Sequence, residues 1–276
     1  MSASTSISPA RYLVGAVCAA LAFVALYLFF VRSYNGQIVD QLAFDGAEFG
    51  SRSVTPLTIQ LLDLVPLISA LIGLVLTLVI AAVRRNWPTL LVALGAAGAA
   101  VATTQVLKYA VLSRPDLGVA GYADNSFPSG HTTVAAASAL AVFLVSSPRM
   151  RPMVAAWGSA FAVAAGLSTV ANHWHRPSDV IAGLLVVAFW GCLAGVVLSS
   201  VQPAGAAVAR PWRAGRLAWI VVPFSVVTGL AFVITVLRAS GESTETLIAY
   251  VGGMAAIVAA GFAISLVGTR LFARLP

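Results

Sequence analysis

Eight apolar runs, most of them about twenty residues long, constrain the fold of this chain more than any other feature. They cover residues 12–31, 57–83, 89–112, 132–147, 153–171, 180–200, 217–237 and 247–268. About twenty residues of α-helix cross the hydrocarbon core of a bilayer, and these runs lack the alternation of β-barrel strands. Because 60% of the residues are hydrophobic and 9% are charged, a soluble domain could not bury them. The sequence therefore predicts an all-α, polytopic membrane bundle of about eight transmembrane helices.

The first run and the two cysteines each allow a second interpretation. Arg11 precedes the first run, as in a secretory signal peptide, but the run is longer than a usual signal core. No small-residue cleavage site follows it, so we predict an uncleaved first span. Cys18 and Cys192 both fall inside apolar runs, which favours small packing residues over a disulfide or a metal site.

The 16 basic residues are divided unequally between the two sets of loops. If both termini and alternate loops share one side, that side carries no acidic residue and these arginines: Arg11, Arg84, Arg85, Arg149, Arg151, Arg210, Arg213, Arg216, Arg270 and Arg274. Every acidic residue except Asp63, which falls near one end of the second run, belongs to the other side. The positive-inside rule then predicts a cell-membrane protein with both termini in the cytoplasm. Topology thus explains the net charge of +7, and we expect no nucleic-acid partner.

All three histidines and the single lysine lie in or beside two loops on the opposite, extracytoplasmic side. The first loop lies between the segment Lys108–Pro115 and the segment Phe127–His131, where the fourth run begins. The second loop lies within Ser168–Asp179 and carries His173 and His175. Short connections make consecutive helices antiparallel neighbours, so we expect these segments to meet at the outer membrane face.

Four residues of the first loop suit the binding of a phosphate. Lys108 and Arg114 supply positive charge for phosphate oxygens. Ser129 and Gly130 open a helix, where unpaired backbone N–H groups bind anions and glycine lets the backbone approach closely.

Two histidines on different elements suit attack on that phosphate. His175 and Asp179 are four residues apart, one turn if helical, so the carboxylate can fix the imidazole tautomer of a nucleophile. His131, at the start of the fourth run, can protonate the leaving oxygen. His173 is a possible helper or a simple interface residue beside Trp174. No cluster has the spacing of a metal site, so neither metal nor cofactor is predicted.

These motifs resemble the membrane-embedded branch of the type 2 phosphatidic acid phosphatase (PAP2) superfamily, whose fold is shared with vanadium haloperoxidases. The resemblance is carried by Pro128–His131 and by Ser168 with His175 and Pro177–Asp179. It implies that His175 forms a phosphohistidine, that Asp179 is its partner and that His131 is the general acid. The phosphate would be held by Lys108, Arg114, Ser129 and Gly130, without a metal. It also implies a single integral membrane domain over 1–276, with a catalytic core region at 55–200 and a two-helix extension at 201–276.

Two positions depart from the family pattern. Five residues separate Lys108 from Arg114, one fewer than in the family, which would turn a helix by about 100° unless it unwinds first. Thr169 stands where the family has an arginine, so a bidentate phosphate donor has become a hydroxyl. Arg176 is a possible replacement cation. Asp63, the other ionisable residue within a run, is predicted to be a structural partner of a neighbouring helix or of Arg114.

The resemblance implies hydrolysis of a lipid-linked phosphate monoester or diphosphate at the outer membrane face. The expected partners are membrane lipid and a lipid phosphate substrate. Two alternatives stay open: a phosphotransferase that uses the same intermediate, and a catalytically weak relative that binds or transports a lipid phosphate. A transporter should carry polar residues along a transmembrane path, and these runs carry few.

Overall fold

The computed structural model describes residues 8–48, 64–119, 121, 125–201, 215–238, 243–273 and 275. Over these ranges the chain forms α-helices and no β-strand. Among the described helices, seven are long and apolar enough to cross a membrane, and one further apolar helix is shorter. This confirms the prediction of an all-α polytopic bundle with about eight apolar helices. Asp63 and the start of the expected second span, residues 57–63, lie outside the described residues.

Apart from the helix Tyr34–Asp45, the observed helices follow the predicted runs to within a few residues at most of the described boundaries. The described α-helices are α1 (Ala10–Leu26), α2 (Tyr34–Asp45), α5 (Val65–Arg84), α6 (Trp87–Val106), α7 (Gly130–Val145), α8 (Arg151–Ala171), α9 (Pro177–Val201), α10 (Gly215–Arg238) and α11 (Ser243–Leu271). Two of them continue into a π-helical turn, Tyr27–Val31 after α1 and Leu107–Val111 after α6.

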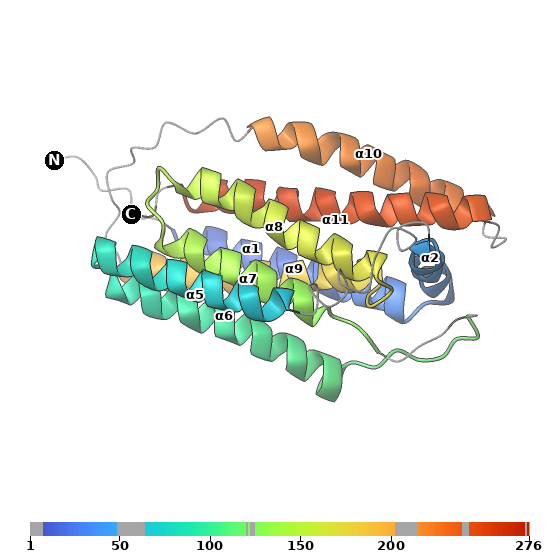
Figure 1. The fold of residues 1–276 in the computed structure, drawn as a ribbon, viewed down its shortest axis with the longest axis horizontal. Helices are drawn as coiled ribbons and strands as arrows, with labels where there is room; N and C mark the ends of the chain where they lie inside the picture. Colours follow the sequence, from blue (N-terminus) through green and yellow to red (C-terminus); the bar gives the residue numbers. More distant parts are fainter. Residues whose placement is uncertain are drawn as a thin grey trace.

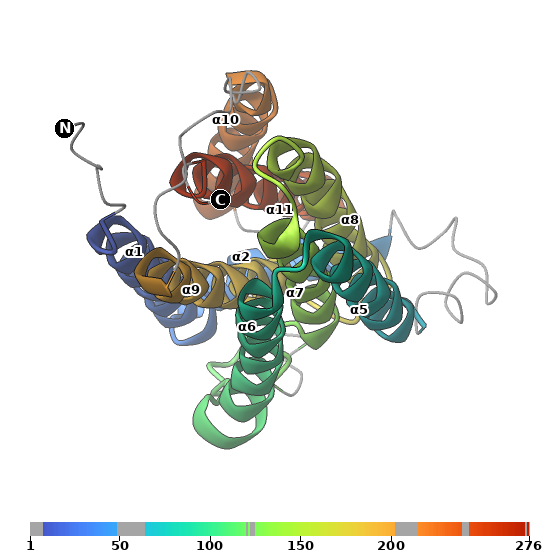
Figure 2. The same cartoon turned by 90° about the vertical axis from the view of Figure 1, so that its left-hand side faces the viewer.

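The long helices run side by side, and α7 lies at the centre of the bundle (Figures 1 and 2). Helix α7 packs against α5, α6, α8 and α9. Its buried residues include Ala135, Ala136, Ala137 and Ala141. Small side chains let helix backbones approach closely, which drives packing where the solvent is itself apolar. The alanines of α7 therefore let the neighbouring helices pack closely around it.

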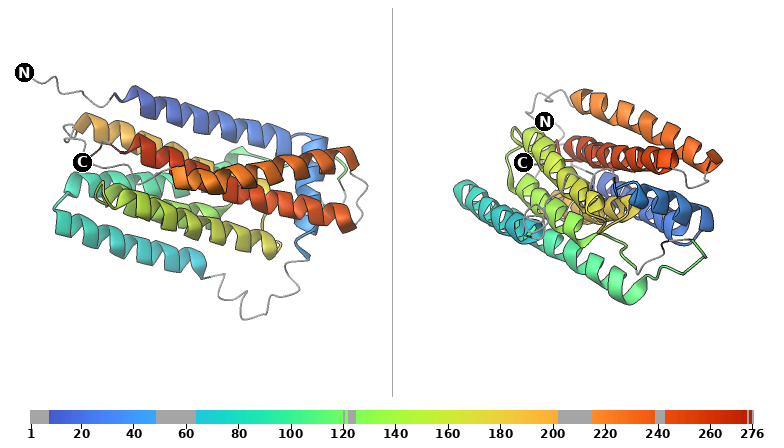
Figure 3. Two further views of the ribbon diagram at one scale, coloured as in Figure 1. Left: turned by 90° about the horizontal axis from the view of Figure 1, so that it is seen from above. Right: turned by 45° about the vertical axis from the view of Figure 1, so that its right-hand side comes forward.

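Helix α2 lies between the first two apolar runs, where the pattern of runs predicts no helix. It crosses one end of the bundle instead of running along it (Figures 1 and 3). Ser33 caps its first turn by accepting the N–H of Gly36 at 3.1 Å. Its buried face includes the polar residues Gln37, Asp40 and Gln41. A helix that buries polar side chains needs polar partners there, and these partners belong to the candidate site.

The last two helices are not equivalent. Helix α10 packs mainly on α11 and lies at the edge of the bundle (Figure 3). Most of its described residues are exposed, as expected in lipid. Helix α11 packs also on α2, α8 and α9. A Cβ at Gly253 of α11 would lie 2.5 Å from Cγ of Pro177, the first residue of α9. The C-terminal extension therefore supports the start of α9 directly.

Candidate active site

His175 and Asp179 lie next to each other where α9 begins. Nδ1 of His175 lies 3.4 Å from Oδ2 of Asp179, at the long end of hydrogen-bond distances. The His175 residue is 5% exposed, and Asp179 is fully buried. Because Nδ1 faces the carboxylate, Nε2 is the ring nitrogen that remains for chemistry.

Asp179 is held by donors from three segments of the chain. Its Oδ1 accepts from Nη2 of Arg114 at 3.0 Å. Its Oδ2 accepts from the Ser126 hydroxyl at 2.6 Å and from the backbone N–H of Arg176 at 2.9 Å. A buried carboxylate is costly unless such partners replace its lost water. These bonds therefore stabilise the carboxylate and fix it against the imidazole of His175.

The start of α7 lies against the start of α9. The backbone N–H of Ser129 donates to the backbone carbonyl of Asp179 at 2.8 Å. The Ser129 side chain caps α7 by accepting the N–H of Thr132 at 3.4 Å, while Gly130 is the first helical residue. The ring centroids of His131 and His175 are 6.1 Å apart. The two histidines are thus neighbours beside a helix N-terminus, where backbone N–H groups lack intrahelical acceptors.

Lys108 and Arg114 occupy different environments. Lys108 lies in the π-helical turn and is partly exposed, with Nζ 5.6 Å from the centroid of the Tyr109 ring. The helix ends at Val111, so the chain unwinds before Arg114, and Arg114 turns inward to Asp179. The short spacing between the two cations is therefore bridged by non-helical chain from residue 112 onward.

The Thr169 hydroxyl does not take the place of the arginine in the family pattern, because it is bound within its own helix. Thr169 is 2% exposed, and its hydroxyl donates to the backbone carbonyl of Gly166 in its own helix, at 2.8 Å. Such a bond satisfies a hydroxyl locally. A cation for this part of the site has to come from another element.

Arg176 is the nearest such cation in sequence, and α2 holds it. Its Nε and Nη2 donate to Oε1 of Gln41, and its guanidinium lies 4.9 Å from the centroid of the Phe44 ring. Burial, aided by the nearby charge of Arg114, lowers the pKa of Arg176 from its usual value. Arg114 and Arg176 also line one small pocket together with Gln37, Gln41 and Val119.

His173 has a backbone role at the end of α8. Its φ of 57° is left-handed, and its N–H donates to the carbonyl of Val170. The next N–H, of Trp174, donates to the carbonyl of Thr169 at 2.9 Å. This is the Schellman arrangement, with a histidine where glycine is usual. The reversal turns the chain so that His175 comes back toward α7.

Sequence reasoning missed three residues of this cluster: Asp40, Gln41 and Ser126. Asp40 accepts two hydrogen bonds from Ser178, beside Asp179. The signal for α2 was the spacing of Gln37, Asp40, Gln41 and Phe44, which places them on one helix face. Ser126 immediately precedes the Phe127–His131 segment and could have been grouped with it.

The assembled cluster offers cations, a helix N-terminus and two adjacent histidines, one of them paired with a carboxylate. Across the part of the chain that the structure describes, no group of three or more His, Cys, Asp or Glu side chains is placed to hold a metal ion. Fold and site together define a class: a multi-pass helical membrane protein with a buried histidine–aspartate pair beside cationic side chains.

The model of the PAP2 superfamily matches residues 89–203. This segment contains all the predicted site residues, from Lys108 to Asp179. No curated protein and no solved structure matches the chain. Residues 89–203 are thus similar to the PAP2 superfamily, and the apolar helices are consistent with its membrane branch. This similarity suggests phosphatase activity on phosphate esters.

Proposed function

We propose that this protein hydrolyses a lipid-linked phosphate monoester or diphosphate at the outer membrane face, without a metal, through a phosphohistidine. The observation that carries the proposal is the position of His175, with Nδ1 toward Asp179 and its ring beside that of His131. One nitrogen is oriented by a carboxylate, and the other remains for attack on phosphorus. A second base stands on a separate helix.

In the first step, Nε2 of His175 forms a bond to phosphorus while the bond from phosphorus to the leaving oxygen breaks. His131 gives that oxygen its proton, so the lipid leaves as an alcohol or as a shorter phosphate. Asp179 stabilises the positive charge that develops on the imidazole of His175. Lys108, Arg114 and Arg176, with the N–H groups at the start of α7, stabilise the phosphoryl oxygens.

In the second step, water attacks the phosphorus of the phosphohistidine. His131, now neutral, takes the proton of that water, and the bond between phosphorus and nitrogen breaks. Inorganic phosphate leaves, and both histidines return to their starting states.

The position of the site supports a lipid substrate. The site is at one end of a bundle of membrane-spanning helices, beside the ends of α6 and α8 and the starts of α7 and α9. A substrate with a polar head and an apolar tail can place its phosphate there while the tail stays in the bilayer. The asymmetry of arginines between loops supports the outer face.

The test uses the full-length protein purified in detergent. Phosphate release is measured from phosphatidic acid, phosphatidylglycerol phosphate and polyprenyl diphosphates, with and without EDTA. We expect turnover of at least one of these that survives the chelator, and inhibition by vanadate. His175→Ala should abolish turnover and the acid-labile phosphoprotein trapped by rapid quenching. Asp179→Asn should weaken turnover because the wrong tautomer is favoured.

Three other outcomes would reject the proposal or part of it. Activity lost in EDTA and restored by a divalent cation would reject the metal-independent mechanism. Phosphate transfer to an added alcohol in preference to water would assign a phosphotransferase. Binding of a lipid phosphate without release from any lipid, unchanged in His175→Ala, would assign a binding relative.

A further inference from the structure

Asp40, on α2, is a second buried carboxylate beside the candidate active site. It is 2% exposed, and it binds both donors of one residue of α9. Its Oδ1 accepts the backbone N–H of Ser178 at 3.2 Å, and its Oδ2 accepts the Ser178 hydroxyl at 2.5 Å. Because Ser178 directly precedes Asp179, these two bonds fix the first turn of α9, where the partner of His175 lies.

Arg114 connects the two carboxylates. Its Nη2 is 3.0 Å from Oδ1 of Asp179, and its Nη1 is 3.9 Å from Oδ2 of Asp40. One guanidinium is therefore shared between a carboxylate that faces His175 and a carboxylate from α2. Loss of the charge on Asp40 would leave the guanidinium to Asp179 alone and change the field at His175.

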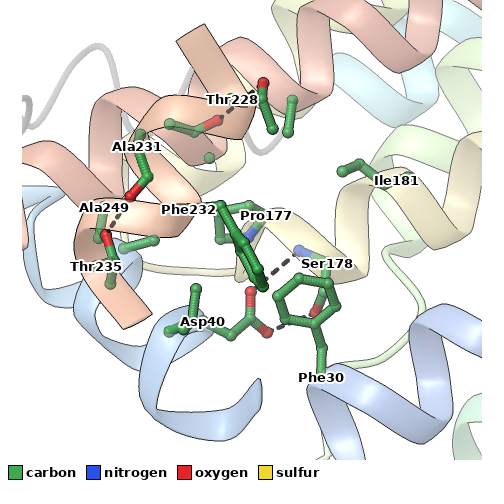
Figure 4. Close-up of a pocket in the computed structure, with 15 residues that line it drawn as sticks. Phe30, Asp40, Pro177, Ser178, Ile181, Thr228, Ala231, Phe232, Thr235 and Ala249 are labelled. Carbon is green, nitrogen blue, oxygen red and sulfur yellow. Dashed lines mark hydrogen bonds between the residues drawn. The ribbon is translucent and has the colours of Figure 1, made fainter. Parts of the chain in front are cut away.

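Asp40 also lines a mostly apolar cavity. With Ser178 it forms the polar end of this cavity of about 60 Å³ between α2, α9, α10 and α11 (Figure 4). Helices α10 and α11 line the cavity with uncharged residues, of which Thr228 and Thr235 donate their hydroxyls to their own helix backbone. The charged groups near Asp40 are Arg114 from the segment after α6, Arg176 before α9 and Asp179 in α9.

We infer that Asp40 is a positioning residue for the His175–Asp179 pair, acting through Ser178 and Arg114. This inference rests on the proposed function of His175 as the nucleophile. Asp40 itself does not bind the substrate phosphate in this scheme. Its ionised form holds the start of α9 and shares Arg114, so the imidazole keeps the geometry needed for attack.

Turnover should depend on pH through the protonation of Asp40, and the direction can be stated. Burial raises the pKa of Asp40 from 3.8 to about 6, against the lowering effect of Arg114. A carboxylate with a raised pKa is protonated in the folded protein over a pH range where a free aspartate is charged. Protonation removes the charge shared with Arg114, so turnover should rise as pH increases through about 6.

Two substitutions at Asp40 separate its hydrogen bonds from its charge. In Asp40→Asn the amide oxygen can accept the N–H of Ser178 and the amide nitrogen can donate to its hydroxyl, but the charge is gone. Asp40→Ala loses the bonds as well. The matched control is Thr235→Val, which changes a buried residue of the same cavity without contacting Ser178.

The kinetic test compares the four full-length proteins on a phosphate ester across pH. In Asp40→Asn we expect kcat to fall by about 10- to 100-fold with KM nearly unchanged, and the pH profile to lose the contribution of Asp40 and so differ from that of wild type. Asp40→Ala should fall further, and Thr235→Val should behave as wild type. Wild-type kcat and an unchanged pH profile in Asp40→Asn would overturn the inference, as would an equal loss in Thr235→Val.

A second readout does not need turnover. The chain has three histidines, so ring ¹⁵N signals can be assigned by single substitutions. Wild type should show His175 as one tautomer, protonated at Nδ1, and Asp40→Ala should show a mixture, whereas Thr235→Val should not. If wild type hydrolyses no phosphate ester, the proposed function fails, and these signals still decide the role of Asp40. Identical His175 signals in wild type, Asp40→Asn and Asp40→Ala would overturn it.

Discussion

Oε1 of Gln41 accepts hydrogen bonds from both Nε and Nη2 of Arg176, at 3.2 and 2.5 Å. The two residues are 135 positions apart in the chain, and both are buried. The bond pair joins α2 to the segment that carries His175. It also directs the guanidinium of Arg176, whereas the Thr169 hydroxyl is bound to its own helix.

Arg176→Ala and Gln41→Ala test whether Arg176 binds phosphate. Arg176→Ala removes a charge-assisted donor, so we expect kcat/KM for a phosphate ester to fall by about 10- to 100-fold. Gln41→Ala keeps the cation and removes only its acceptor, so the loss should stay within about fivefold. Steady-state kinetics on both variants measures the difference. Equal losses in the two variants would limit Arg176 to a structural role.

The sequence predicted the long helices and the proximity of His175 to Asp179, and the physical reasons are visible in the structure. Bilayer thickness sets the length of each apolar run, so the spans follow from composition alone. The spacing of His175 and Asp179 is local, and one turn of backbone at the start of α9 brings them together.

Helix α2 and the partners of Arg114 could not be predicted in the same way. The buried residues of α2 are mixed, with polar side chains beside apolar ones such as Val39 and Leu42, so apolar periodicity marks this helix only weakly. The partners of Arg114 depend on elements far apart in the chain, at Asp40 and Asp179. A long flexible side chain with five donors allows many such pairings, and only the assembled fold selects one.

The left-handed backbone at His173 gives a prediction on stability. Left-handed φ costs a non-glycine residue about 1–2 kcal/mol, and more for β-branched side chains. His173→Gly removes this cost but also loses the edge contact of the ring with Phe44. Its free energy of unfolding should therefore fall no more than about 0.5 kcal/mol below that of wild type. His173→Val should be less stable by about 1–2 kcal/mol. Thermal unfolding in detergent measures both.

Turnover of the same variants tests the role of the His173 ring. Since that ring packs against Phe44, His173→Gly should retain activity close to wild type. A folded His173→Gly protein without turnover would give the ring a part in the chemistry.

Single cysteines can test on which side of the membrane the site lies. In a background with Cys18→Ser and Cys192→Ala, Asp116→Cys lies in the segment before α7 and Arg149→Cys in the turn before α8. Both native residues are exposed. From the arginine asymmetry we expect an impermeant thiol reagent to label position 116, and not position 149, on intact cells. Permeabilised cells should label both, and labelling of 149 alone would place the chemistry in the cytoplasm.

The assignment of His131 as the general acid is tested by changing the leaving group. Without a proton donor, expulsion of a lipid alkoxide is slow, so His131→Ala should lower kcat for an alkyl phosphate by about 10²- to 10⁴-fold. An aryl phosphate or a diphosphate leaves more easily without protonation, so its loss should be much smaller. The His131 ring lies 5.3 Å from that of Trp174, and loss of this contact could also disturb the site. Trp174→Leu removes the same contact but keeps the acid, and its loss should not depend on the leaving group. Rates of both variants over a series of phosphate esters give the measurement. A loss in His131→Ala that is equal for alkyl and aryl esters would show that His131 supports the site without donating the proton.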